Sequence, residues 1–312
     1  MYESHLGCQE RPFALVPDPR YFFASRGHKE ALNHLLYGIR REEGFVVITG
    51  EVGTGKTTLC RTLLRKLDPQ IETAVILNPS QSEEELLQTI LGDLGVSVPT
   101  AATRREFLDA LNTHLVESRA AGKRVVLIID EAQDLPPRLL EQIRLLSNLE
   151  TEREKLIQII LVGQVELSAK LCRRDLRQLN QRVAVRYRLP RLRPKETRAY
   201  IQHRLARAGA ERHDLFTWGA LQLVHHFSDG IPRLINILCD RALVAMYARR
   251  LKRVTPSTIR LAWRSLYPAW DPARQVVSPT MGLQRVASAV ALLAAALASA
   301  TAGTVLGMWQ AP

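Results

Sequence analysis

The sequence contains little cysteine, and its cysteines are scattered. The four are far apart and form no CxxC pair: Cys8, Cys60, Cys172 and Cys239. This spacing argues against a disulfide framework or a structural zinc site, and it fits a reducing compartment. The eight histidines form no H-x-x-x-H pair and no cluster with cysteine, so no transition-metal site is predicted.

The N-terminal residues 1–13 lack the apolar core of a signal peptide, so we expect this part of the chain to stay in the cytoplasm. Acidic residues are also in deficit, because 31 Asp and Glu face 43 Lys and Arg, a formal net charge of +12. Such a balance favours an anionic partner, whether nucleic acid, a nucleotide or a membrane surface. At 46% apolar residues, the 312-residue chain is otherwise typical of a globular protein with one composite domain or two.

Short apolar runs alternate with longer amphipathic segments, which is typical of an α/β fold with a parallel sheet. The predicted strands are 45–50, 73–79, 125–130, 156–163 and 183–189. The segment 82–94 begins with a serine followed by glutamates, the pattern of a helix capping box. From Pro194 onward only helical patterns remain, at 195–209, 216–228, 231–250 and 255–266. We therefore predict an α/β core over 41–193, with residues 1–40 as its N-terminal segment, and a helical lid over 194–267.

Residues 286–309 contain no charge, and as a helix they would extend about 36 Å, enough to cross a bilayer core of about 30 Å. We predict a transmembrane helix there, after a linker at 268–285 and before a tail at 310–312; a buried core helix is the alternative. Residues 241–285 carry nine Lys and Arg against the single acid Asp271. The positive-inside bias then places the N-terminal bulk in the cytoplasm, with the bilayer itself as a partner.

The strongest motif is G-x-x-x-x-G-K-T, which lies between a predicted strand and a predicted helix. In this context its backbone N–H groups point at phosphate oxygens, Lys56 neutralises the β- and γ-phosphates, and the Thr57 hydroxyl binds Mg²⁺. The predicted cofactors are therefore ATP and Mg²⁺. The predicted binding residues of the loop are Gly50, Glu51, Val52, Gly53, Thr54, Gly55, Lys56, Thr57 and Thr58.

Two more predicted strands end in polar residues. The run VVLII ends in Asp130 and Glu131, which we assign to Mg²⁺ binding and to orienting the attacking water, respectively. On its own, an acidic pair after a strand more often lies in a solvated turn. Its combination with the phosphate loop favours the functional interpretation. The next strand ends in Gln164, whose amide would hold the water or the γ-phosphate.

Three arginines are candidates for contact with the nucleotide. Eight arginines lie between Arg173 and Arg193, and among them we propose Arg182, and next Arg177, as a finger that reaches the nucleotide of a neighbouring subunit. A basic surface is the alternative. Arg233 lies in the first turn of a lid helix after Gly-Ile-Pro, where a cation is unfavourable for the helix dipole and a phosphate partner gives a motive.

Taken in order, these parts resemble the AAA+ ATPases, and more closely the general secretion pathway protein A family. The resemblance covers residues 1–268 and includes the segments PFALVPDPRYFF, GEVGTGKTT, LIIDEAQDL, LRQLNQRVAVRYRL and GIPRLINILCDRAL. It implies a phosphate-loop core with a helical lid, ATP hydrolysis and a ring or other homo-oligomer. It also implies that Pro17, Asp18, Pro19 and the stretch Tyr37–Ile39 border the adenine.

The resemblance implies a cytoplasmic ATPase, anchored in the inner membrane by one span, that helps to assemble a secretion or pilus machine with an envelope partner protein. The best-known members carry a peptidoglycan-binding domain after the span. Here three residues follow it, so no peptidoglycan binding is predicted for these 312 residues. The alternative function is a DNA-binding regulator of transposition, and a scaffold that binds ATP without turnover is a third possibility.

Overall fold

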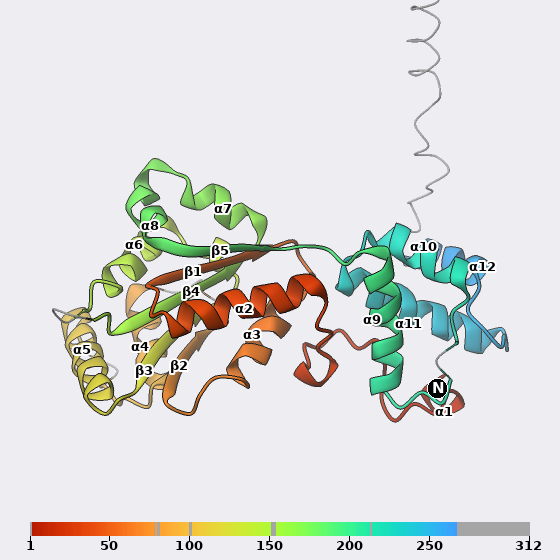
Figure 1. Cartoon of the computed structure of the whole chain (residues 1–312), viewed down its shortest axis with the longest axis horizontal. Helices are drawn as coiled ribbons and strands as arrows, with labels where there is room; N and C mark the ends of the chain where they lie inside the picture. The colour runs from red at the N-terminus through yellow and green to blue at the C-terminus, as the bar shows by residue number, and fades with distance from the viewer. Residues whose placement is uncertain are drawn as a thin grey trace, which may run out of the picture. The chain divides into compact units, whose positions relative to one another are not determined.

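The computed structural model describes residues 2–77, 79, 82–99, 102–150, 154–212 and 214–266. From Met1 to Arg260 the chain forms one compact unit, built around a five-stranded parallel sheet of order β2-β3-β4-β1-β5 (Figure 1). The strands are β1 (Phe45–Gly50), β2 (Ile71–Ile76), β3 (Arg124–Ile129), β4 (Ile157–Gly163) and β5 (Val183–Leu189). All four neighbouring pairs are parallel, as the sequence predicts.

The predicted strand bounds agree closely with the observed ones. Strands β1 and β5 have the predicted limits, β4 begins one residue later than predicted, and β3 begins and ends one residue earlier. Strand β2 begins and ends earlier than predicted, because Leu77 already lies in a bend and is exposed. The three strands that the motifs follow, β1, β3 and β4, are neighbours in the sheet, and β4 lies between the other two.

Alternate residues of each strand face opposite sides of the sheet, and apolar helices cover both sides. Val46 and Ile48 of β1 pack with helices α2 (Arg26–Arg40) and α3 (Lys56–Leu64). Phe45 and Val47 belong to the cluster on the other side. That cluster includes residues of α4 (Glu83–Asp93), α5 (Arg104–Ala120), α6 (Pro137–Leu146), α7 (Val165–Leu171) and α8 (Arg177–Arg182). The central strands β1, β3 and β4 are therefore buried on both faces, which explains their apolar runs in the sequence, whereas the edge strand β5 exposes Arg186 and Arg188.

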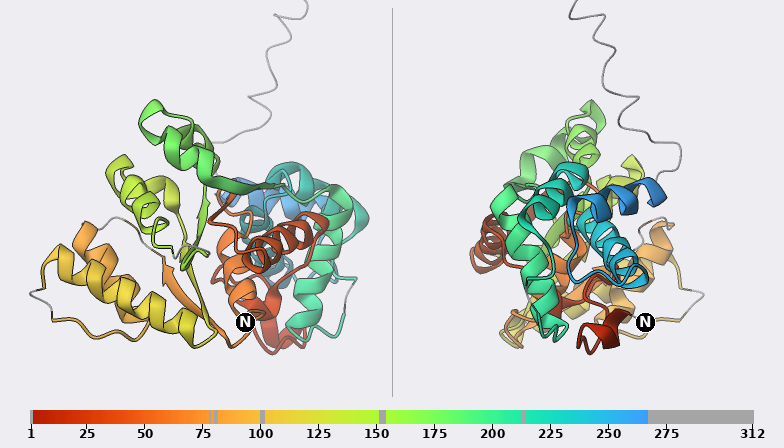
Figure 2. Two further views of the ribbon diagram at one scale, coloured as in Figure 1. Left: turned by 60° about the vertical axis from the view of Figure 1, so that its left-hand side comes forward. Right: turned by 90° about the vertical axis from the view of Figure 1, so that its right-hand side faces the viewer.

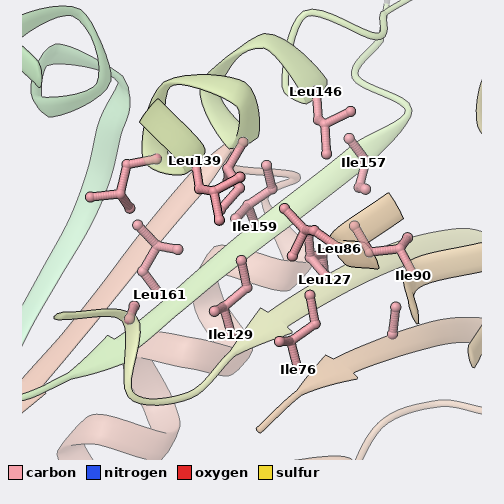
Figure 3. Packing of buried hydrophobic residues seen from close by; sticks show 14 of the residues in the cluster. Ile76, Leu86, Ile90, Leu127, Ile129, Leu139, Leu146, Ile157, Ile159 and Leu161 are labelled. Carbon is pink, nitrogen blue, oxygen red and sulfur yellow. The ribbon is translucent and has the colours of Figure 1, made fainter. Parts of the chain in front are cut away.

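Figure 3 shows the packing at the larger of the two clusters, where leucines of α4 and α6 lie over isoleucines of β2, β3 and β4. Helix α4 begins as predicted, since the Ser82 hydroxyl accepts from the Glu85 backbone N–H, and the Glu85 carboxylate accepts from the Ser82 backbone N–H. This capping box satisfies two backbone donors that the helix would otherwise leave unpaired.

After β5 the described chain is helical, as predicted. The helices are α9 (Pro194–Arg207), α10 (Trp218–Ser228), α11 (Pro232–Ala248) and α12 (Pro256–Leu266). The short N-terminal helix α1 (Tyr2–His5) packs on α11 (Figure 2). There the Tyr2 hydroxyl donates a 2.5 Å hydrogen bond to Asp240. The segment after α1 then runs through the 3₁₀ turn η1 (Pro19–Tyr21), which contacts α9 and α3 and so joins the helices to the sheet.

Within the described part of the chain, no helix combines the length and the apolar character needed to cross a membrane. The predicted linker, the span at 286–309 and the tail lie outside the described residues. The transmembrane helix therefore stays a prediction.

Candidate nucleotide-binding site

A cavity of about 300 Å³ opens where β1 and β3 end. Its wall comes from three parts of the chain: the loop and first turn after β1, the N-terminal segment, and helices α9 and α11. The residues of the loop and first turn that line it are Val52, Gly53, Thr54, Gly55, Lys56, Thr57 and Thr58. Glu131 and Arg233 also line it, so the structure brings together predicted site residues that are far apart in the sequence.

Two glycines give the phosphate loop its shape. Gly53 and Gly55 have φ angles of +79° and +100°, a region that side chains with a Cβ disfavour. A Cβ at position 53 would lie 2.6 Å from the Cβ of Arg233, so the space for α11 also depends on this glycine. The backbone N–H of Arg233 donates a 3.1 Å hydrogen bond to the Gly53 carbonyl. The start of α11 is thus bonded directly to the phosphate loop.

Lys56 is buried at the base of this loop. Its ammonium group donates to the carbonyl oxygens of Gly50, at 3.0 Å, and Glu51, at 3.2 Å. Burial lowers the pKa of Lys56, and the charges of Glu131 and Asp130 oppose that shift. Two carbonyls and two nearby carboxylates hold the cation inside a loop whose N–H groups suit phosphate.

Thr57 and Asp130 form the second contact of the site. The Thr57 hydroxyl donates a 2.6 Å hydrogen bond to the Asp130 carboxylate, which also accepts from the Glu131 backbone N–H at 2.9 Å. Burial raises the pKa of Asp130, and these two hydrogen bonds lower it. A hydroxyl and a carboxylate oxygen in contact, below a phosphate loop, are the donor set that fits a magnesium ion whose other ligands are water and phosphate.

Glu131 enters the cavity wall in a strained conformation, with φ +51°. Its carboxylate accepts a 2.9 Å hydrogen bond from the side-chain amide of Gln133. Gln164 does not appear in the wall; its backbone N–H donates to the Gln133 amide oxygen at 2.8 Å. The structure therefore connects Gln164 to Glu131 through Gln133, and the predicted role of the Gln164 side chain stays a prediction.

The two candidate finger arginines are exposed and lie away from the cavity of their own chain. Arg182, at the end of α8, donates a 2.8 Å hydrogen bond to the Ser147 hydroxyl. Arg177 begins the same helix. An arginine finger acts on the nucleotide of a neighbouring subunit. The position of Arg182 and Arg177 in a single chain therefore does not test this prediction.

The far end of the cavity includes residues that the sequence did not single out. Arg204 of α9 is buried, lies 4.4 Å from the centroid of the Tyr21 ring, and donates to the carbonyls of Pro12, at 2.5 Å, and Ala14, at 2.9 Å. Tyr200, one turn earlier, donates to Asn236 at 2.9 Å. Arg204 and Tyr200 lie on an ordinary amphipathic helix, so no sequence signal marked them.

The adenine border that the resemblance implies stays a prediction, and the cavity wall contains only some of its residues. Pro17 and Asp18 line the cavity. Pro19 and the stretch Tyr37–Ile39 do not. Gly38 instead faces β1, where an added Cβ would lie 2.5 Å from Val46, so this part of α2 serves close helix–sheet packing.

His28 was also missed. Its Nε2 lies 3.1 Å from the Thr54 carbonyl of the phosphate loop, and its Nδ1 lies 2.7 Å from the Ser25 hydroxyl. A carbonyl only accepts, so Nε2 carries the proton and Nδ1 accepts from Ser25. Burial lowers the pKa of His28, which keeps the ring neutral. The neutral imidazole thereby ties the start of α2 to the loop.

Arg191, between β5 and α9, connects the loop to the helical part from the other side. It donates to the Glu51 carboxylate at 2.7 Å and pairs with Asp229, which follows α10. Arg191 lowers the pKa of Glu51. Both the phosphate loop and the turn before α11 are therefore held by one guanidinium group.

Comparison with known proteins identifies the domain that contains this cavity. Residues 39–171 match the family described as an AAA domain. The chain is 47% identical over 262 residues to general secretion pathway protein A of Aeromonas hydrophila, a match that covers 84% of this chain and 48% of that protein. The chain thus spans about half the length of that relative.

Solved structures with the same fold include Cdc6p from Pyrobaculum aerophilum, with a TM-score of 0.63, 20% identity, and coverage of 81% of this chain and 70% of that one. The ORC2 protein of Aeropyrum pernix, in its ADPNP–ADP complexes, gives a TM-score of 0.61 at 18% identity and covers 81% and 71% of the two chains. At these identities the likeness shows the fold alone. It confirms the predicted parallel-sheet, phosphate-loop core.

Proposed function

Because the chain carries an AAA domain and, over the matched region, belongs to the general secretion pathway protein A family, we propose that it is a membrane-anchored ATP hydrolase. Its hydrolysis drives the assembly of an envelope secretion machine, of a type II-like or pilus kind, from the cytoplasmic side of the inner membrane. The single observation that supports the catalytic part most strongly is the convergence of Lys56, Thr57 and Glu131 on one cavity.

ATP is the nucleotide that this proposal places in the cavity. The β- and γ-phosphates lie in the loop of residues 50–58, beside the first turn of α3, where the N–H groups and Lys56 offset their charge. Thr57 and Asp130 hold the magnesium ion, which supplies charge neutralisation at the phosphates. The Arg233 side chain lies at the start of α11, which is bonded to Gly53, so it is placed to meet the γ-phosphate and to link nucleotide state to the lid.

Hydrolysis requires a base that orients and polarises water. Glu131 is the carboxylate of the cavity wall that lies in the turn after β3, and this turn is held by hydrogen bonds on both sides. We assign it this role, with Gln164 assisting at the end of the neighbouring strand. Arg182 or Arg177 of a second copy completes the charge stabilisation, which makes the active form a homo-oligomer.

The secretion role rests on the relative, whose name places it in the general secretion pathway. The membrane anchor rests on the uncharged run 286–309 and on the nine basic residues of 241–285. The same basic residues would attract anionic lipid, worth about 1 kcal/mol for each cation near the surface. An envelope protein is the expected assembly partner.

The catalytic part is tested with the purified full chain. Wild type should bind ATP with magnesium and hydrolyse it, Lys56→Ala should lose nucleotide affinity, and Glu131→Gln should bind ATP without turnover. Nucleotide affinity that Lys56→Ala leaves unchanged would contradict the site. Unchanged turnover in Glu131→Gln would remove Glu131 from its role.

The cellular part is tested by fractionation. A chain that resists carbonate extraction from membranes supports the anchor. A soluble chain retained on DNA is the outcome expected of a transposition regulator, and it would replace the secretion proposal.

A further inference from the structure

Gln133 lies between the two strand ends that carry the catalytic residues. It belongs to the short 3₁₀ turn η2 (Ala132–Asp134) that follows Glu131. Its amide nitrogen donates to the Glu131 carboxylate at 2.9 Å and to Asp134 at 3.1 Å. Its amide oxygen accepts the Gln164 backbone N–H at 2.8 Å. One side chain therefore bridges Glu131, in the turn after β3, and Gln164, the residue after β4.

The surroundings of Gln133 are shaped for this bridge. A Cβ at Gly163 would lie 2.8 Å from the Gln133 amide oxygen, so only glycine before Gln164 leaves room for the contact. Lys170 of α7 donates to the carbonyls of Gln133, at 2.5 Å, and Leu135, at 2.8 Å, which holds the backbone of the turn.

Glu131 needs such support because its backbone is left-handed, at φ +51° and ψ +36°. For a residue with a Cβ this conformation costs about 1–2 kcal/mol and persists only where neighbours impose it. The Gln133 amide directs one carboxylate oxygen and leaves the other without a donor from this turn. The Gln133 amide thus orients the carboxylate, and a base held in one orientation lowers the barrier to reaction.

We infer that Gln133 is a positioning residue that sets the Glu131 carboxylate at the cavity wall and ties it to the end of β4. This inference rests on the proposed function for its catalytic consequence. The bridge itself is independent of that function. Any movement of Gln164 when phosphate binds would reach Glu131 through a single amide.

The informative variant is Gln133→Glu. It keeps the length of the side chain and an oxygen that accepts from Gln164, but it replaces the donor to Glu131 with a like charge. We expect kcat to fall at least about tenfold, with KM and the Kd for ATP within about twofold of wild type. Gln133→Ala should lower kcat similarly. The control is Asp134→Asn, which changes the exposed second acceptor of Gln133 and should keep wild-type kcat.

A second readout does not depend on turnover. Hydrogen exchange of the Gln164 backbone N–H should accelerate in Gln133→Ala and stay slow in Gln133→Glu, at equal Tm of the rest of the fold. The inference would be overturned by a wild-type kcat in Gln133→Glu, or by a Gln164 exchange rate that is the same in both variants as in wild type. If the wild-type chain binds ATP without hydrolysing it, the proposed function fails, and hydrogen exchange alone then decides whether Gln133 bridges the two strand ends.

Discussion

The Thr57 hydroxyl lies 2.6 Å from the Asp130 carboxylate, so the first turn after the phosphate loop is bonded to the end of β3 across a neighbouring strand. The two residues are 73 positions apart in the sequence. This contact places both predicted magnesium ligands together through their own hydrogen bond. It also compensates the burial of Asp130, since a hydrogen bond to a buried charge is worth about 1.5–3 kcal/mol.

Removing the hydroxyl should therefore affect chemistry and stability together. Thr57→Ala should lower magnesium-dependent turnover by roughly 100-fold or more, and the free energy of unfolding by about 1–3 kcal/mol, because Asp130 loses a donor. Steady-state kinetics against magnesium concentration and urea unfolding measure the two effects. Thr57→Ser keeps the hydroxyl and should retain most of both. Equal loss in the serine and alanine variants would contradict the assignment.

The stability of the fold should decrease as the pH falls. Burial holds the pKa of His28 below its ordinary value near 6.5, as it does for His203 and His225. The unfolded chain takes up these protons near pH 6.5, whereas the folded chain resists, so stability is complete above that pH and is lost as the pH falls toward the folded pKa values.

His28→Gln isolates the share of this residue. The amide keeps a donor for Thr54 and does not titrate, so the loss of unfolding free energy between pH 7.5 and 5 should be shallower than in wild type. Urea unfolding over that pH range is the measurement. His203→Gln is the control: it should also flatten the slope but leave ATP affinity unchanged, whereas His28→Gln should weaken it. An unchanged slope in both variants would exclude these rings as the source.

Loss of Arg204 should destabilise the protein more than loss of an exposed arginine on the same helix. Arg204→Met leaves the buried carbonyl of Pro12 and the partly buried carbonyl of Ala14 without their donor, and the buried one alone should cost about 1–3 kcal/mol. Denaturant unfolding should show a loss in that range and weaker ATP binding, since Arg204 lines the cavity. Arg198→Met, exposed on α9, should change neither quantity. Similar values for the two variants would contradict this role.

The ion pairs of Arg191 with Glu51 and Asp229 should have only a small coupling free energy. Loss of Arg191 should nevertheless lower the affinity for ATP measurably. All three side chains are partly exposed, and such pairs contribute about 0.2–1 kcal/mol. A double-mutant cycle of Arg191→Ala and Glu51→Ala should give a coupling in that range, decreasing with salt. ATP affinity should fall in Arg191→Ala, because the loop and the turn before α11 lose their common partner. A coupling free energy that does not change with ionic strength would exclude an ionic interaction between Arg191 and Glu51.

Much of the fold follows from local sequence patterns. Apolar runs predicted the buried strands β1, β3 and β4, because strands covered on both faces need apolar side chains at nearly every position, whereas β5 was predicted although it carries two exposed arginines. The capping-box pattern of Ser82 and Glu85 predicted the start of α4, because this contact is local in the sequence. The glycines of the phosphate loop and the acidic pair after β3 could also be predicted from the sequence. Their residue types and their positions next to predicted strands indicate phosphate and magnesium binding.

The rest of the site depends on distance in three dimensions. Arg204 and His28 act through contacts with carbonyls at Pro12 and Thr54, and a backbone carbonyl carries no sequence signature. Gln133 lay inside the segment LIIDEAQDL, but only the order of the strands reveals that its amide reaches Gln164. The stretch Tyr37–Ile39 was assigned to the adenine by resemblance alone; the structure shows that Gly38 packs against Val46, a contact that no local pattern reveals.

Strand β4 is buried along its whole length and pairs with β3 on one side and β1 on the other. Inserting or deleting one residue within it would reverse the direction of every later side chain and displace Gln164 by about 3.3 Å. Exchanges among its isoleucines, leucine and valine, by contrast, only repack the two faces, at typically less than about 1.5 kcal/mol. Sequence variation in β4 should therefore change the identity of its residues but not the number of residues in the strand.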